Sequence, residues 1–291
     1  MFLSFSCSFL LSIVMLLVYA FPVFADHDVP LKEGQSSQVS APVSQSPIKE
    51  ISPAVELLKI WQEPLSGMEF VWVEGGCFSM GCGAWDADCP NREQPEHEVC
   101  VNGYWIGRFE VTQGEWKKLM GTNPATHRIS DRHPADRISW NDSLDIIEKL
   151  NSRKYGLRFK LPTEAEWEFA ARGRGRPDPF SGGKDVEVVA WYLTNSADVP
   201  HAVGTKSVNS QGIYDMSGNV REWVEDWYDP EYYQKSPAQN PQGPRAGTMR
   251  VIRGGSWSGN FHTVRTTSRA WNGPTVRMSG NGIRLVAVSF P

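Results

Sequence analysis

The residues of this sequence with the clearest chemical potential are its cysteines. The chain contains five, and Cys7 lies in an apolar N-terminal segment, which leaves Cys77, Cys82, Cys89 and Cys100. An even number in an oxidising compartment indicates two disulfides, and four cysteines allow three pairings. We favour Cys77 with Cys100, which would join two expected neighbouring strands, and Cys82 with Cys89, which would close a short loop. A zinc site is the alternative, but the spacing lacks the close Cys-x2-Cys pair of structural zinc sites.

A serine and a histidine offer a second chemistry. Ser256 and His262 lie close together in the sequence, as a nucleophile and its general base could if an acid completed a hydrolase triad. The stretch 254–259, Gly-Gly-Ser-Trp-Ser-Gly, is only superficially close to the Gly-x-Ser-x-Gly nucleophile elbow. The other histidines show no short metal-ligand spacing such as His-x3-His. We therefore favour neither a hydrolase nor a histidine-based metal site.

Three glutamates at one helix start could be taken for catalytic acids. In the segment Leu161–Glu168, Thr163 suits the N-cap and Glu166 follows three residues later, which is the pattern of a capping box. Glu164, Glu166 and Glu168 also lie where the helix dipole favours acidic side chains. Caps and surface charge are the favoured interpretation of these carboxylates.

The composition is that of an ordinary globular protein with unusual anchors. The chain has 291 residues, a net charge of −4 and a pI of about 5.9. With no basic excess to hold a phosphate backbone, nucleic acid is not an expected partner. Twelve tryptophans, 26 glycines and 20 prolines predict a loop-rich domain held by large aromatic side chains.

The N-terminal segment predicts export. Residues 1–25 are nearly all apolar and end in Val23-Phe24-Ala25, which suits cleavage of a signal peptide after Ala25. No Lys or Arg precedes the apolar run, and at about 20 residues it is long enough to tether an uncleaved chain to a membrane. We expect a periplasmic or secreted protein with a flexible linker over residues 26–52, rich in Ser, Gln and Pro.

The remaining elements indicate an α+β domain over residues 68–291. A short amphipathic helix is expected over 53–62, within a lead-in that reaches residue 67. Helices are expected to begin near Val111, Ser139 and Thr163 and strands to cluster toward both ends, so that the terminal strands meet in one sheet. The strands are expected at 69–73, 99–101, 104–106, 188–192, 251–253 and 283–288.

Six blocks in this region resemble the sulfatase-modifying factors, the formylglycine-generating enzyme family. The resemblance covers roughly residues 68–290, and it implies the C-type-lectin-like fold of that family, with limited secondary structure and many ordered loops. In chain order, the blocks are Val73–Gly81, Glu110–Thr112, Leu161–Glu168, Gly212–Trp223, Arg253–Trp257 and Asn281–Leu285.

The resemblance implies a structural calcium site. By position in the family's loop, Asp215 and Glu222 would supply carboxylate oxygens, and Gly218 and Val220 would supply backbone carbonyls. Hard oxygen donors from a tight loop are what Ca²⁺ prefers. The alternative is an Asp-initiated turn in which Glu222 pairs with an arginine. The family's second calcium loop has no clear counterpart here.

The catalytic part of the resemblance fails. The family's copper-dependent oxidases carry two cysteines shortly after the Gly-Gly-Ser, whereas this chain has no cysteine beyond Cys100. Because Cu(I) is a soft ion that prefers sulfur, copper and formylglycine formation by the known route are not expected. Ser256 matches a serine of the family's active site, and with His262, Arg253, Arg265 and Arg269 it would line the old substrate groove.

Two functions compete on these grounds. The first is an exported, calcium-stabilised binding or accessory module for a protein, peptide or glycan, for which Trp191, Trp257 and Trp271 could supply a stacking surface or could instead anchor the core. The second is a periplasmic oxidoreductase of altered chemistry, similar to relatives that mature a siderophore chromophore without the cysteine pair. An open groove with perturbed ionisable groups would favour the enzyme.

Overall fold

The computed structural model describes residues 58–289 except residue 87. These residues belong to the compact unit Val55–Pro291. The predicted signal peptide, the linker and residues 53–57 of the predicted helix lie outside the described residues. No helix within 58–289, leaving out residue 87, is both long and apolar enough to cross a membrane.

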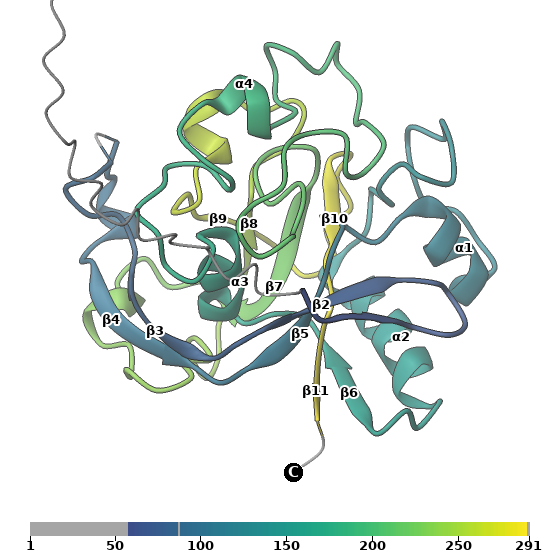
Figure 1. The fold of residues 1–291 in the computed structure, drawn as a ribbon, viewed down its shortest axis with the longest axis horizontal. Coiled ribbons are helices and arrows are strands. Elements are labelled where there is room, and N and C mark those ends of the chain that lie inside the picture. Colours follow the sequence, from purple (N-terminus) through teal and green to yellow (C-terminus); the bar gives the residue numbers. More distant parts are fainter. Residues whose placement is uncertain (1–57, 87, 290–291) are drawn as a thin grey trace, which may run out of the picture. The chain divides into compact units, whose positions relative to one another are not determined.

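A five-stranded antiparallel sheet joins strands from both ends of the described chain (Figure 1). Its order is β1-β2-β5-β11-β6, so β11, the last strand in the sequence, is an inner strand. This arrangement confirms that the terminal strands meet in one sheet. The strands are β1 (Ile60–Gln62), β2 (Glu69–Val73), β5 (Tyr104–Gly107), β11 (Val286–Ser289) and β6 (Leu157–Lys160).

A second sheet of four strands has the order β10-β7-β8-β9. The pair β10–β7 is parallel and the other pairs are antiparallel. Because β9 pairs only with β8, it forms an edge of this sheet. The strands are β10 (Asn281–Ile283), β7 (Arg221–Trp227), β8 (Arg250–Arg253) and β9 (Ala270–Asn272).

The remaining strands, β3 (Gly76–Met80) and β4 (His97–Val101), form an antiparallel pair in which Cys77 lies opposite Cys100. A disulfide joins these two cysteines, and a second joins Cys82 to Cys89. The favoured pairing is confirmed. The zinc alternative is wrong because each of the four sulfurs is bonded to its partner in one of these two disulfides.

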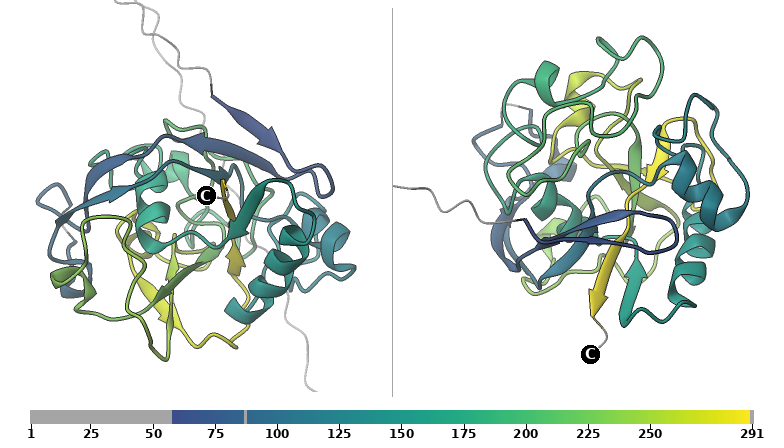
Figure 2. Two further views of the ribbon diagram at one scale, coloured as in Figure 1. Left: turned by 90° about the horizontal axis from the view of Figure 1, so that it is seen from below. Right: turned by 45° about the vertical axis from the view of Figure 1, so that its right-hand side comes forward.

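The three longer helices each begin with a capping box, as the sequence predicted for α3. In each, the N-cap hydroxyl accepts from the N3 backbone and the N3 carboxylate accepts from the N-cap backbone. Helix α2 packs against β6 and α1 packs against α2, so that the two helices lie on one side of the domain (Figure 2). The helices are α1 (Gln113–Met120), α2 (Trp140–Asn151), α3 (Glu164–Ala171) and the single turn α4 (Val186–Val189); the 3-10 turns are η1 (Asn91–Glu93), η2 (Tyr232–Gln234) and η3 (Phe261–Val264).

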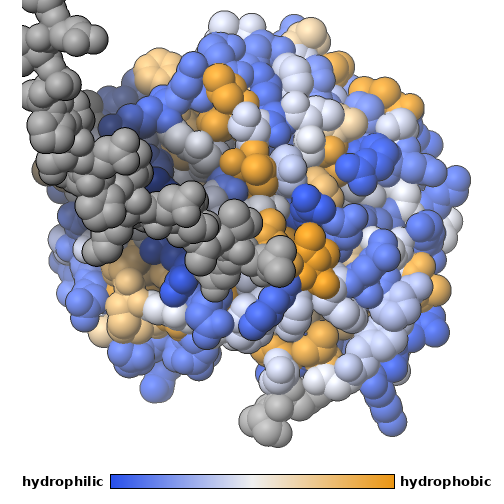
Figure 3. All heavy atoms as spheres, viewed as in Figure 1, coloured by the Kyte–Doolittle hydropathy of each residue, from blue (hydrophilic) through white to orange (hydrophobic). Residues whose placement is uncertain are grey.

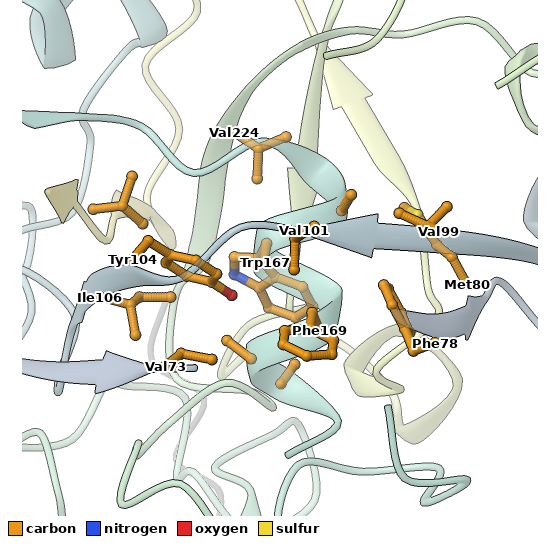
Figure 4. Packing of buried hydrophobic residues seen from close by; sticks show 14 of the residues in the cluster. Val73, Phe78, Met80, Val99, Val101, Tyr104, Ile106, Trp167, Phe169 and Val224 are labelled. Carbon is orange, nitrogen blue, oxygen red and sulfur yellow. The ribbon is translucent and has the colours of Figure 1, made fainter. Parts of the chain in front are cut away.

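Trp167 of α3 lies at the centre of one hydrophobic cluster (Figure 4). It is fully buried, and Tyr104, Val101 and Phe169 surround its ring in that view. A second cluster packs α2 against both sheets through residues such as Ile146. The two clusters fix α3 and the second sheet relative to the five-stranded sheet, and this arrangement positions the residues discussed below.

Three sequence predictions differ from the structure. Residues 60–62 of the predicted helix form strand β1, because this segment pairs with β2. The strand predicted over 188–192 begins inside α4, where the Asp185 side chain caps the turn by accepting from the Glu187 amide. The strand predicted over 283–288 is divided between β10 and β11 at residues 284–285, where Arg284 makes a buried ion pair with Glu222.

Candidate functional site

The loop predicted to bind calcium is a tight turn inside the domain. Asp215 and Asn219 both have left-handed backbone conformations, with φ of 58° and 54°. Gly218 has φ of 81°, and a Cβ there would lie 2.1 Å from the Trp191 carbonyl oxygen. Only glycine fits this close backbone approach. The loop is buried from Asp215 to Glu222 apart from Arg221, which is partly exposed.

Glu222 is held by an arginine and a tryptophan. Arg284 donates from Nη2 to Glu222 Oε1 at 2.7 Å and from Nε to both oxygens at 3.0 and 3.1 Å. The Trp167 indole donates to Oε2 at 2.7 Å. Both carboxylate oxygens of Glu222 are therefore engaged by protein donors, as in the alternative that paired this residue with an arginine.

A buried acid that the sequence analysis did not single out completes the cluster. Glu110 accepts from the Asn219 side chain at 2.6 Å and from the Val220 amide at 2.8 Å. Burial raises the pKa of Glu110 well above its usual value, and the nearby charges of Asp215 and Glu222 raise it further. The only sequence signal was its place in the block Glu110–Thr112, which marked the family but no role.

The Asp215 carboxyl is also perturbed by burial. Its Oδ2 accepts from the Gly204 amide at 2.7 Å, and burial raises the pKa of its carboxyl to about 6. Glu110, Asp215 and Glu222 are thus three buried carboxyls gathered around Arg284, and a further cation among the described residues, Arg132, acts on Asp215. Such an excess of buried negative charge is costly unless protons or a cation compensate it.

Some of the oxygen atoms of this loop could coordinate a cation, and others are already engaged. Within residues 58–289 without residue 87, no hydrogen bond is directed at the carbonyl oxygens of Gly218 or Val220, or at Oδ1 of Asp215. These three oxygens could serve a hard ion such as Ca²⁺, whereas Glu222 would have to share its oxygens with Arg284. In the same part of the chain, no three His, Cys, Asp or Glu side chains already stand at metal-binding distances.

The glutamates of α3 are only partly explained by caps and surface charge. Glu166 makes the predicted capping contact, but Glu164 and Glu168 are buried. Arg269 donates to both oxygens of Glu164 at 2.7 and 2.8 Å, and Arg253 donates to Glu168 at 2.6 Å. The surface-charge interpretation is wrong for these two residues, because both are buried in ion pairs with arginines. The sequence does not show which arginines approach them.

The candidate catalytic residues are not brought together. The Ser256 hydroxyl is buried and lies 3.2 Å from Ser258 Oγ. His262 is half exposed, and its Nδ1 lies 2.7 Å from Asp88 Oδ2. Arg265 is buried in ion pairs with Glu93 and Asp86. Among the described residues, no hydrogen bond joins Ser256 to His262, which a triad would require.

A cleft of about 330 Å³ adjoins the Gly-Gly-Ser segment at Gly255. Of the arginines predicted to line a groove, Arg269 lines this cleft, whereas Arg253 and Arg265 are not part of its lining. Arg221 and Trp271 also line it, which the sequence analysis did not predict. Trp271 is 44% exposed, whereas Trp191 and Trp257 are partly buried, each against a histidine ring. Trp271 is therefore the tryptophan of the three best placed to meet a ligand.

Comparisons with known proteins agree with this arrangement. The sulfatase-modifying factor enzyme 1-like domain matches residues 59–288. The chain is 28% identical over 247 residues to the chaperone protein LppX of Paenibacillus barcinonensis, covering 67% of this chain and 81% of that protein. It is 33% identical over 200 residues to the formylglycine-generating enzyme of Streptomyces coelicolor, covering 62% of this chain and 60% of the enzyme.

Among solved structures, Treponema denticola variable protein 1 aligns with a TM-score of 0.70 and 29% identity, covering 79% of this chain and 98% of that one. Several other matched relatives are longer, and the chain spans less than half of their length. The α+β fold predicted from the resemblance is confirmed. On the match over residues 59–288, the chain belongs to the sulfatase-modifying factor family, to which the formylglycine-generating enzymes also belong.

Proposed function

We propose that this chain is an exported binding or accessory module that has kept the family scaffold without formylglycine-generating chemistry. One observation carries the proposal: the four cysteines from Cys77 onward are all consumed in disulfides. No thiolate remains among them to hold Cu(I), and residues 257–264, which follow Ser256, offer hydroxyl, amide, indole and imidazole groups but no sulfur. The two disulfides also support an oxidising, non-cytoplasmic location.

The chemistry can be tested directly. The purified mature chain would be incubated with copper and a cysteine-containing peptide, with the Streptomyces coelicolor enzyme as a positive control. Mass spectrometry would follow conversion of the peptide thiol to an aldehyde. We expect conversion only in the control. Copper-dependent conversion by this chain would refute the proposal, because it would require a ligand set other than a thiolate pair.

We further propose that calcium stabilises the module at the Asp215–Glu222 loop. Support comes from the three buried carboxyls around Arg284 and from the two loop carbonyls that receive no hydrogen bond within the described residues. A bound divalent cation would offset the excess negative charge without protonation. The ion would act on stability, and through the turn at Gly218 it would hold the segment that leads into β7.

An oxidoreductase of altered chemistry remains the second candidate, favoured by the cleft beside Gly255. Counting calcium, copper and iron per chain after mild dialysis separates the two. Calcium without a redox metal agrees with the module. Stoichiometric copper or iron would put the enzyme first, because it would reveal ligands that the described residues do not already gather.

A further inference from the structure

The cleft beside Gly255 is lined by three arginines and no acidic residue. The arginines are Arg92, Arg221 and Arg269, and the remaining lining combines Thr263 and Ser268 with the apolar side chains of Ile252 and Trp271 and the backbone around them. A concave surface with positive groups on one side and an aromatic ring on another favours an anionic ligand that also has an apolar part.

Two of these cations are already partly neutralised. Arg269 is bonded to both oxygens of Glu164. Arg92 donates to the Arg269 carbonyl at 3.2 Å and lies 4.0 Å from Glu93, whose carboxylate is itself bonded to Arg265. These contacts fix the positions of both guanidinium groups, and they leave Arg92 only weakly paired.

Arg221 differs from its neighbours in lacking a counterion. Its guanidinium makes no hydrogen bond or ion pair with any residue in 58–289 outside residue 87, although the side chain is only partly exposed. Burial lowers its pKa, and no carboxylate offsets that effect. A partly buried charge without a protein partner depends on water or on a ligand for compensation, and a ligand carboxylate would supply the missing charge.

A larger cavity elsewhere lacks this property. It measures about 470 Å³ and includes Lys160 and Glu166 in its lining. These two residues pair with each other at 2.7 Å, so the cavity presents no uncompensated cation. The face seen in Figure 3 likewise shows small apolar areas separated by hydrophilic side chains. The arginine-lined cleft is therefore the stronger candidate for a specific ligand.

The elements around the cleft favour a peptide. Ala270 and Trp271, which line it, belong to β9, the edge strand of the second sheet. An extended segment can add to such an edge through its backbone while alternate side chains enter adjacent pockets. Trp271 is held by stacking on Tyr228, with ring centroids 4.1 Å apart, so its exposed face is already oriented.

We propose that this cleft binds an extended acidic peptide segment, with one carboxylate paired to Arg221 and the neighbouring backbone aligned along β9. A charge-assisted hydrogen bond to a guanidinium is strong and directional, and here it would also relieve the isolated charge. This inference rests on the proposed binding function and names the class of partner for it.

The test uses the mature chain and two terminally blocked peptides. In one peptide valine alternates with glutamate, and in the other glutamine replaces glutamate; fluorescence polarisation measures both. We expect the acidic peptide to bind at least about tenfold more tightly. Arg221→Gln should remove that preference, and Arg245→Gln, at an exposed arginine outside the cleft, should retain it.

Measuring the thermal unfolding temperature controls for the possibility that the Arg221→Gln variant fails to fold. Because Arg221 has no counterion among the described residues, Arg221→Gln should unfold at the same or a higher temperature than the wild type. A lower temperature would show that the arginine is structural and would overturn the proposal. Equal affinity for the two peptides would refute the acidic specificity and leave the binding function standing.

Two further outcomes would also overturn the inference. Binding of an acidic oligogalacturonide in preference to both peptides would assign the cation to a glycan. Failure of every probe to bind would count against a peptide in this cleft; the binding function itself would then depend on the formylglycine and metal assays, which do not involve the cleft.

Discussion

The buried carboxyl of Asp215 makes stability depend on pH and calcium together. In the folded chain, burial moves its pKa from 3.8 to about 6. At about 1.4 kcal/mol for each pH unit, this change corresponds to about 3 kcal/mol. At about pH 3 and below, the group is largely protonated in both folded and unfolded chains and costs almost nothing. As pH rises to about 6 and beyond, folding must hold the ionised form, so this contribution to stability is lost.

The variant Asp215→Asn isolates that contribution, because the amide keeps an oxygen for the Gly204 amide but does not titrate. Without calcium, the variant should exceed the wild type by less than about 1 kcal/mol near pH 4 and by up to about 3 kcal/mol at pH 7.5. The difference includes the coupling to Glu110, whose pKa Asp215 also raises. Urea unfolding at both pH values measures it.

Calcium should reverse the order at pH 7.5. Only the wild type keeps the carboxylate ligand, and a ligand at about 1,000 times its dissociation constant adds about 4.1 kcal/mol to stability, which exceeds the metal-free deficit of about 3 kcal/mol. The reasoning is refuted if the metal-free difference between wild type and variant is the same at both pH values. The calcium proposal fails separately if calcium stabilises both proteins equally, or neither.

Three other predictions concern stability. Glu168→Ala should cost about 3–5 kcal/mol in urea unfolding, because it takes the carboxylate from buried Arg172 and leaves buried Arg253 with Glu164 alone, at 3.4 Å; a loss below about 1 kcal/mol would contradict the buried ion pairs. Gly218→Ala should destabilise more than Gly121→Ala, since both have positive φ but only the first meets a backbone oxygen, at 2.1 Å. Equal losses would remove the steric argument. Cys77→Ser should cost about 3 kcal/mol, and peptide mapping without reduction should find Cys77 joined to Cys100 in the wild type.

Local signals in the sequence predicted local structure well. The capping box at Thr163 and Glu166 could be recognised because both partners lie within four residues. The strand predicted over 188–192 was wrong at its start, because Val188 and Val189 belong to α4; valines favour strands, whereas the Asp185 side chain caps this helical turn. Structure that depends on residues close in the sequence could be predicted when the capping pattern was recognised, as at Thr163. At Asp185 strand propensity was followed instead of the cap, and the prediction was wrong.

The candidate site was less predictable because its partners are distant in the sequence. Glu222 was identified by its place in a motif, but its contact with Arg284 joins residues 62 positions apart. Glu110 lies 110 positions from Val220, whose backbone amide donates to its carboxylate. Arg221 carried no signal, because what distinguishes it is the counterion it lacks. Such features follow from packing, which single-sequence patterns do not encode.

The inner position of β11 has a consequence for how the chain reaches its folded state. This strand lies between β5 and β6, yet it follows β5 by well over half of the domain's length. The five-stranded sheet cannot close until nearly the whole domain has been synthesised. Until then, the inward edges of β5 and β6 remain available to other chains. Chaperones or rapid local disulfide formation near Cys77 should therefore matter most during that interval.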